Sequence, residues 1–275
     1  MDSQTTKTRY RLGFIGAGKL AGSVIRGLVR SKFCAPHEII ASEPNEAARE
    51  ALRNEVAISV TPDNAEAAER ADVLLLGVKP SVVLPALSAI SAAAGNKLVI
   101  SLAAGVRLET MEKITQARLM RALTNTPSAI CRAATAIARG TRTTDQDLKE
   151  AQKIFGAIGV VVEVAEEHID AVTALAGSGP AFVYTVIEAL AQGGTRVGLP
   201  ADVSLTLATH TVLGAAQLAS ESGLSPEELR RMVVTPGGTT AAGLAAMEKH
   251  ATAEGLIAAV EAATRRGQEM AEENK

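Results

Sequence analysis

The chain has 275 residues, enough for two domains and a sizeable core. Hydrophobic residues make up 47% of it, but aromatic residues only 2%, so small aliphatic side chains must fill the interior. The formal net charge of −2, without a basic stretch interleaved with aromatic residues, argues against a nucleic-acid partner.

Cysteine content and apolar segments indicate the compartment. Cys34 and Cys131 fit a reducing environment and cannot form a four-cysteine cage; with no metal-ligand motif in the sequence, we expect no metal. Residues 1–11 lack the apolar core of a signal peptide. The most membrane-like segment, residues 172–191, contains Pro180 and Glu188, which favours a buried helix over a membrane span. We therefore expect a cytoplasmic protein with no membrane partner.

The first predicted elements form a strand, a glycine turn and a helix. An apolar run at Arg11–Ile15 enters Gly16-Ala17-Gly18 and leaves in a helical pattern that begins with Lys19 and Leu20. Gly16 permits a sharp turn, and Gly18 permits backbone to approach a pyrophosphate, which the helix N-terminus would attract. This order predicts a dinucleotide site. The alternative is an ordinary tight turn, since a lone glycine motif is weak evidence.

The first 165 residues alternate strand and helix patterns. Strands are predicted at Arg11–Ile15, Glu38–Ser42, Ala57–Val60, Val73–Val78, Lys97–Leu102, Arg118–Leu123, Ala134–Arg139 and Val160–Val164. Helices between them include Asn45–Asn54, Ser81–Ala92 and Asp145–Gly156. The alternation predicts an α/β fold with a Rossmann-type, doubly wound parallel sheet, and the short later connections allow an antiparallel part.

Three strand ends offer further cofactor contacts, because ligands bind at the carboxyl edge of such sheets. Ser42 could bond a phosphate, whereas Glu43 could repel a phosphate, bond a ribose or point to solvent. Lys79 could meet phosphate or ribose, or simply precede a helix that starts at Pro80. The small residues Ala103, Ala104 and Gly105 leave room for a flat ring, or make a turn.

After Glu166 the pattern is helical. Helices are predicted at His168–Val197, Ala201–Ser222, Pro226–Val233, Thr239–His250 and Ala253–Glu272. We therefore expect a dinucleotide-binding domain at residues 1–165 and an all-helical substrate and dimerisation domain at residues 166–275.

Two glycine-containing segments interrupt these helices. Residues 176–181 contain Ser178, Gly179 and Pro180, which predicts either a kink or ligand contact, or a plain loop between helices. Residues 235–240 place Gly237 and Gly238 before Thr239 and Thr240 at a helix N-terminus. That turn is suited to a small carboxylate, and an ordinary threonine N-cap is a compatible interpretation.

The helical part lacks a lysine between Lys153 and Lys249, although hydroxyacid dehydrogenases place a catalytic lysine on the first long helix of their second domain. His168 and His210 are the histidines between those two lysines, and a lone helical histidine is usually structural. The chemistry therefore needs little acid–base help beyond hydroxyl groups and water.

Motifs along nearly the whole chain resemble the pyrroline-5-carboxylate reductase family. They are residues 14–21 (FIGAGKLA), 78–80 (VKP), 101–106 (SLAAGV), 121–127 (RALTNTP), 170–182 (DAVTALAGSGPAF), 193–194 with 198–200 (GG, GLP) and 236–244 (PGGTTAAGL). The segments around 177–181 and 236–240 are far more specific than the glycine turn. Leu123 and Thr124 differ from the methionine and proline frequent in the family.

The resemblance implies a set of binding residues. Cofactor contacts are expected from Gly16, Ala17, Gly18, Lys19, Leu20, Ser42, Asn64, Val78, Lys79 and Pro80, to which the strand end adds Ala103, Ala104 and Gly105. Substrate contacts are expected from Ser178, Gly179, Gly237, Gly238, Thr239 and Thr240. Serine and asparagine at positions 42 and 64 favour NADPH. Glu43 departs from the small residue often seen at its position in the family, so NADH stays an alternative cofactor.

The implied reaction is hydride transfer to the C=N carbon of 1-pyrroline-5-carboxylate, giving L-proline. Thr240 would bond the ring nitrogen, and Arg121 and Asn125 would line or brace the cleft. The family assembles through its helical domain into homodimers, often five in a ring, which implies a decamer. The alternatives are a reductase of another imine acid, a hydroxyacid dehydrogenase, which the missing lysine disfavours, and a nucleotide-binding regulator without catalysis.

Overall fold

A computed structural model describes residues 8–274 of the chain. Residues 1–7, on which part of the expectation about an N-terminal signal segment falls, lie outside the described residues. The chain divides into two compact units, one running through Ser178 and resuming at Ala263, the other comprising Gly179–Ala262. This division by contacts differs from the expected boundary after residue 165, because residues 166–178 and the C-terminal stretch pack with the sheet.

The first unit is built on an eight-stranded sheet of order β3-β2-β1-β4-β5-β6-β7-β8. The strands are β1 Tyr10–Ile15, β2 Ile39–Ser42, β3 Ser59–Thr61, β4 Ala71–Leu76, β5 Leu98–Ser101, β6 Arg118–Leu123, β7 Ala133–Arg139 and β8 Gly159–Glu163. The predicted parallel, doubly wound sheet is confirmed, and its antiparallel part is the pairing of β6 with β7. All eight predicted strands are present, with ends shifted by at most two residues.

The strand order reverses between β1 and β4, which creates the switch point where doubly wound sheets bind ligands. Ile15, the last residue of β1, is in register with the last residues of both neighbouring strands, Ser42 and Leu76. Leu76 is in turn in register with Ser101, the last residue of β5. The turns after these four strands therefore leave the sheet at one edge.

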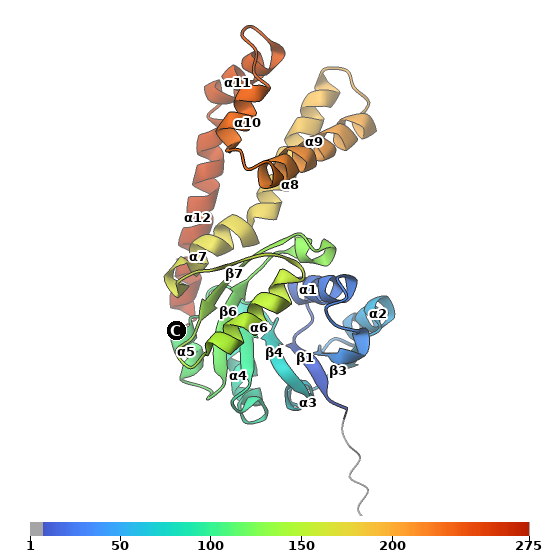
Figure 1. Ribbon diagram of the computed structural model, residues 1–275, viewed down its shortest axis with the longest axis vertical. Helices are drawn as coiled ribbons and strands as arrows, with labels where there is room; N and C mark the ends of the chain where they lie inside the picture. Colours follow the sequence, from blue (N-terminus) through green and yellow to red (C-terminus); the bar gives the residue numbers. More distant parts are fainter. Residues whose placement is uncertain (1–7, 275) are drawn as a thin grey trace, which may run out of the picture. The chain divides into compact units, whose positions relative to one another are not determined.

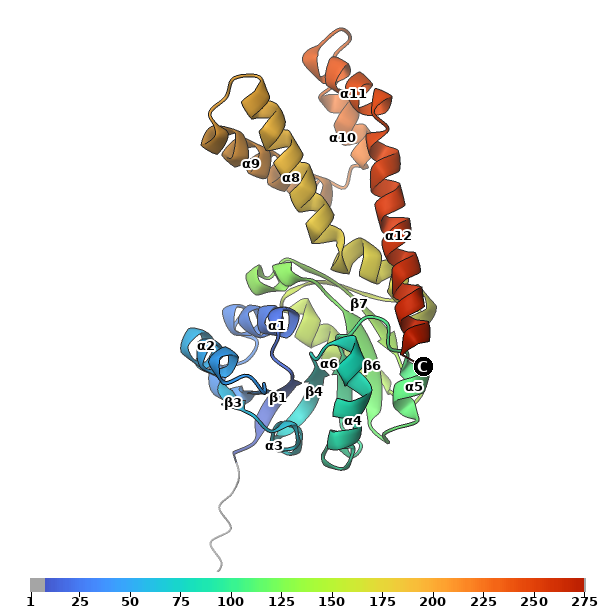
Figure 2. The ribbon, with the colours of Figure 1, turned by 180° about the vertical axis from the view of Figure 1, so that it is seen from behind.

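Helices cover both faces of the sheet, seen from opposite sides in Figures 1 and 2. One core joins the sheet to α1 (Lys19–Arg30), α2 (Glu46–Val56) and α6 (Asp145–Gly156). A second core joins it to α3 (Asn64–Arg70), α4 (Pro80–Ala94) and α5 (Leu108–Glu112). Successive residues of β1 alternate between the cores: Leu12 and Phe14 belong to the first, and Ile15 to the second. Burial on both faces explains the continuous apolar strands.

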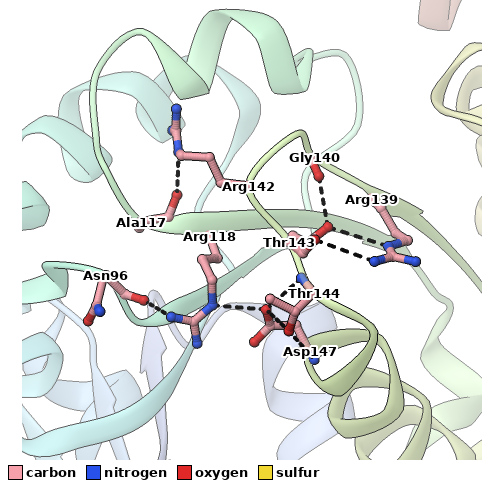
Figure 3. Close-up of polar contacts among 9 residues, drawn as sticks. All are labelled: Asn96, Ala117, Arg118, Arg139, Gly140, Arg142, Thr143, Thr144 and Asp147. Atoms are coloured by element: carbon pink, nitrogen blue, oxygen red, sulfur yellow. Dashed lines mark hydrogen bonds and ion pairs between the residues drawn. The ribbon is translucent and has the colours of Figure 1, made fainter.

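A polar cluster secures the start of β6 (Figure 3). Arg118 donates from Nε to Asp147 at 2.9 Å and also bonds the Asn96 carbonyl. Asp147 accepts from the backbone N–H and the hydroxyl of Thr144, at 2.9 and 2.8 Å, in the capping box that begins α6. The turn Gly140–Thr143 is closed by a bond from the Thr143 hydroxyl to the Gly140 carbonyl. The cluster ties the β7–α6 connection to the sheet.

The chain after β8 is helical, as expected. It forms short helical turns at Glu166–His168 and α7 (Ile169–Val172), a π-helical segment at Thr173–Gly177, then α8 (Gly179–Arg196), α9 (Ala201–Glu221), α10 (Pro226–Met232), α11 (Thr239–Lys249) and α12 (Thr252–Glu273). The stretch Glu166–Arg196 is long and apolar enough to cross a membrane by length and composition alone. The expectation that this stretch is a buried helix is wrong within a single chain, since little of it is covered.

The second unit packs α8 against α9 and leaves much apolar surface open. Its exposed large hydrophobic side chains include Tyr184, Leu190, Leu205, Leu207, Leu213, Leu218, Met232 and Ile257. Exposed apolar patches of this kind mark protein–protein or membrane interaction sites, or ligand-binding grooves.

Candidate active site

The glycine turn after β1 has the conformation its sequence predicts. Gly16 adopts a φ of 86°, which favours glycine, and a Cβ at this position would lie 2.6 Å from Val78 Cγ1. Gly77 follows β4, and a Cβ there would lie 2.5 Å from the Ala21 Cβ. Gly77 is not among the contact residues predicted from the sequence, although its place directly after a buried strand is a usable signal. The two glycines allow the β1 and β4 turns to approach each other at the switch point.

The N-terminus of α1 fits a phosphate group. Gly18 is the N-cap residue, and among the described residues no side chain caps the helix and no acid lies in its first turn. A Cβ on Gly18 would meet no described atom within 4 Å, so the space above it is open. The first backbone N–H groups of a helix have no intrahelical partners and attract anions. Exposed Lys19 adds a positive charge, while Ala17 and Leu20 are half-buried.

Ser42 lies behind Asn64 at the end of β2. Its side chain is fully buried, and its hydroxyl donates to Asn64 Oδ1 at 2.7 Å. The direct bond from Ser42 to a cofactor phosphate, expected from the sequence, needs an exposed hydroxyl, so this arrangement does not support it. Asn64 is the half-buried first residue of α3, and its accepted bond orients the amide so that Nδ2 remains to face a ligand.

Glu43 does not point to solvent. Its Oε2 accepts from the backbone N–H of Ala17 at 3.3 Å, and its Oε1 accepts from the N–H of Asn45 at 3.1 Å. The carboxylate therefore lies on the glycine turn itself, a contact between residues 26 positions apart.

The turn after β4 contains one residue that packs on the core, Val78, and one that is exposed, Lys79. Strand β4 ends at Leu76, two residues before the predicted end at Val78, and the Gly77 N–H still donates to the Ile15 carbonyl at 2.8 Å. Val78 packs on the second core, and Lys79 is exposed. The predicted helix start at Pro80 is confirmed. Lys79 is the N-cap residue of this helix, and its exposed ammonium group can meet an anionic ligand.

The turn after β5 is partly covered. Ala103 is buried, Ala104 is half-buried, and Gly105 is buried with a φ of 65°. A Cβ on Gly105 would lie 2.8 Å from Met270 Cβ in α12, and the Gly105 carbonyl accepts from Asn274 Nδ2 at 3.2 Å. The expected cofactor contact of Gly105 is not supported here, because the end of α12 covers it.

The segment around Ser178 is helical and includes a π-helical turn, so the predicted alternative of a plain loop between two helices is wrong. The Ser178 N–H donates to the Thr173 carbonyl at 2.9 Å, five residues back. Such turns are frequent at functional sites. Asn125 donates from Nδ2 to the Ala176 carbonyl at 3.1 Å and accepts from the Ala134 N–H at 3.2 Å. Asn125 thus braces the segment, and Ser178 at its end is half-buried.

The turn before α11 belongs to the second unit. Gly237 has a φ of 71°, and the Gly238 N–H donates to the Thr235 carbonyl at 3.0 Å, which closes the turn. Gly238 is the N-cap residue of α11, and within the described chain no side chain caps this helix. The ordinary threonine cap is therefore not found. Thr239 is exposed and Thr240 half-buried in the first helical turn, whose N–H groups suit a small carboxylate.

Arg121 is a buried cation near α12. It is 2% exposed and pairs through Nη1 with Glu166 at 3.2 Å, while Glu166 also accepts from the Leu108 N–H at 2.6 Å. Burial lowers the pKa of Arg121, and the Glu166 carboxylate opposes that shift. A cavity of about 730 Å³ adjoins this pair, with Asp170 and Arg265 among its lining residues. Arg121 therefore braces the helical segment against the sheet. Within residues 8–274, no group of three His, Cys, Asp or Glu side chains could hold a metal.

Two protein-family models match the chain. One, described as NADP oxidoreductase, coenzyme F420-dependent, covers residues 11–105 and so includes the glycine turn and the ends of β2 and β4. The other, described as pyrroline-5-carboxylate reductase dimerisation, covers residues 166–270, which include the helices with exposed apolar side chains. The sheet, its switch-point turn and these matches define a dinucleotide-dependent oxidoreductase with a helical C-terminal part.

Full-length relatives narrow this class. The pyrroline-5-carboxylate reductase of Synechocystis is 44% identical over 94% of this chain and 98% of its own length. Solved structures of the Coxiella burnetii enzyme and of the Plasmodium falciparum enzyme with NADP bound share 32% and 26% identity, with TM-scores of 0.86 and 0.87. Their matches cover 96% and 95% of this chain, and 99% and 98% of theirs. The chain belongs to the pyrroline-5-carboxylate reductase family.

Proposed function

We propose that this chain reduces 1-pyrroline-5-carboxylate to L-proline with NAD(P)H, the last step of proline biosynthesis. The observation that carries the proposal is the match, over 94% of the chain, to a relative of that name. The two anion-suited helix starts, at α1 and α11, support it, because the reaction needs a pyrophosphate site and a carboxylate site.

The glycine turn and the N-terminus of α1 would hold the cofactor pyrophosphate, with Lys79 as a nearby cation. When bound, the reduced nicotinamide supplies the hydride for the C=N carbon. We propose NADPH as the preferred donor, with NADH also used. Asn64, oriented by Ser42, would meet the adenine-side ribose or its phosphate.

The turn Gly237–Thr240 would bind the substrate carboxylate, since its backbone N–H groups lie at the start of α11. The Thr240 hydroxyl would donate to or relay a proton toward the ring nitrogen, which gains one proton as the ring carbon gains hydride. Ser178 and Gly179 would line the substrate position. A protonated imine is already electrophilic, so the protein's contribution is positioning and the exclusion of water.

We propose that the exposed apolar side chains of α8 and α9 are covered by a second copy of the chain rather than by a membrane. The functional division would then fall near residue 165, with residues 166–275 forming the substrate and dimerisation part. Five such dimers would make a decamer. The near-neutral formal charge fits a cytoplasmic metabolic enzyme without a nucleic-acid partner.

The test is oxidation of NADPH and NADH by the purified chain with 1-pyrroline-5-carboxylate, alongside a panel of other imine acids and 2-keto acids. Thr240→Ala should lower kcat about tenfold or more and leave NADPH affinity nearly unchanged. Thr252→Ala, at the start of α12, serves as the matched control. Turnover of another imine acid in preference would reassign the substrate, and cofactor binding without any turnover would indicate a regulator.

A further inference from the structure

The corner formed by the end of β2 and the glycine turn carries a charge that a cofactor must meet. Both the side-chain carboxylate and the backbone carbonyl of Glu43 accept hydrogen bonds. Its carboxylate accepts from the N–H groups of Ala17 and Asn45, and its carbonyl accepts from Arg49 Nη1 at 2.7 Å. The side chain is half-buried, so the negative charge has a defined place on the turn.

The side chains of Ser42 and Asn64 at this corner are neutral. Ser42 is buried, and its hydroxyl is used on Asn64 Oδ1, so the residue that can reach a ligand from this side is Asn64 through Nδ2. Beside the Arg49 guanidinium, which bonds backbone carbonyls here, Glu43 and Asn64 thus present one carboxylate acceptor and one amide donor. This set matches a ribose diol, whose hydroxyl groups both donate and accept.

A 2′-phosphate would fit this corner differently from a 2′-hydroxyl. The amide of Asn64 could donate to either group, but the Glu43 carboxylate could accept only from the hydroxyl. Two negative charges brought together at a partly buried site repel each other by an amount that matters for affinity. The Arg49 guanidinium bonds the carbonyls of Glu43 and Pro44, so it does not neutralise that carboxylate directly.

We propose that Glu43 is the residue that sets the choice between NADH and NADPH in this chain. It accepts from the adenine-side ribose of NADH and opposes the 2′-phosphate of NADPH, which keeps NADH an effective donor despite the Ser42–Asn64 pair. This inference rests on the proposed function, because it assigns the glycine turn to a nicotinamide cofactor.

The central variant is Glu43→Gln, which keeps the length of the side chain and one of its two acceptor oxygens and removes its charge. Its control is Glu50→Gln on α2, which removes the same charge from a residue that pairs with Arg53. Binding of NADPH and NADH to the full chain is measured by cofactor fluorescence without substrate. We expect Glu43→Gln to shift the ratio of the two Kd values about tenfold toward NADPH, and Glu50→Gln to leave it unchanged.

Two inhibitors locate the effect. Adenosine 2′,5′-bisphosphate and adenosine 5′-monophosphate differ only in the 2′-phosphate, and we expect Glu43→Gln to strengthen binding of the bisphosphate alone. An equal shift for both compounds, or the same Kd ratio in both variants and the unmodified chain, would overturn the proposal. Because these assays contain no imine, a shift without pyrroline-5-carboxylate turnover refutes the proposed reaction and supports the role of Glu43. Normal turnover without a shift refutes the role of Glu43 only.

Discussion

Asn125 donates a hydrogen bond from its side-chain amide to the carbonyl oxygen of Ala176 at 3.1 Å. In a regular α-helix that carbonyl would accept from the N–H of residue 180, but residue 180 is proline and has no N–H. The side chain from the β6–β7 connection therefore supplies the donor that the helix lacks. This bond lets the π-helical segment place Ser178 and Gly179 without leaving a polar group unsatisfied.

We expect Asn125→Ala to lower the free energy of unfolding by about 2 kcal/mol, because it leaves the Ala176 carbonyl and the Ala134 N–H without their partner. Turnover should fall as well, since the segment before Ser178 loses its support. Urea denaturation and steady-state kinetics measure the two effects. Asn54→Ala, on the exposed side of α2, is the control. Unchanged stability of Asn125→Ala would show that the bond does not support the helix.

The glycine turn offers a matched pair of substitutions. Gly16→Ala should destabilise the fold by about 2 kcal/mol and weaken cofactor binding, because an L-residue is strained at a φ of 86° and its Cβ would clash with Val78. Gly18→Ala should leave the melting temperature almost unchanged, since its Cβ would enter open space in the free protein. It should still raise the Kd for NADPH, because that space is where the pyrophosphate would approach. If Gly18→Ala binds NADPH as tightly as the unmodified chain does, the pyrophosphate must bind at another place.

Asp147 gives the fold a dependence on acid pH. Burial raises its pKa and is the largest single effect, but hydrogen bonds from Arg118 and Thr144 outweigh it, so the pKa is lowered overall. The unfolded chain, with an aspartate pKa of about 3.9, therefore binds this proton more readily than the folded chain. The stabilisation is fully present above the unfolded pKa and is lost as pH falls through the lower folded pKa.

We accordingly expect Asp147→Asn to be less stable than the unmodified chain at pH 7, and the difference to shrink as the pH falls below about 4. Urea denaturation at several pH values measures it. Asp145→Asn is the control, because that carboxylate is 86% exposed and its pair with Arg139 contributes little. A difference that stays constant between pH 7 and pH 3 would exclude Asp147 as its source.

The exposed leucines of α9 test the proposed assembly. Leu207 and Leu213 are 54% and 57% exposed in the single chain, and a charge placed in a buried apolar interface is costly. We expect Leu207→Glu with Leu213→Glu to reduce the mass measured by light scattering, toward that of one chain. Ser220→Glu, which adds one negative charge at an exposed polar position on this helix, should leave the mass unchanged. An unchanged mass for the double variant would locate the interface on another surface.

Local patterns in the chain were enough to predict the eight strands, most helices, the glycine turn and the helix start at Thr239. Each depends on residues a few positions apart: the alternation of apolar side chains, the permissive backbone of Gly16, and the apolar run before it. Continuous motifs also indicated the family. Such features are set by short-range sterics and by the period of burial.

The surroundings of several predicted site residues depend on contacts between segments that are distant in the sequence. Ser42 lies behind Asn64, Glu43 lies on Ala17, and Gly105 lies beneath Met270, pairs separated by 22, 26 and 165 positions. Nothing in the local pattern around Glu43 distinguishes a carboxylate in solvent from one bonded to a turn. That outcome depends on which strands are neighbours and on their register, and these are determined by how both faces of the sheet are buried.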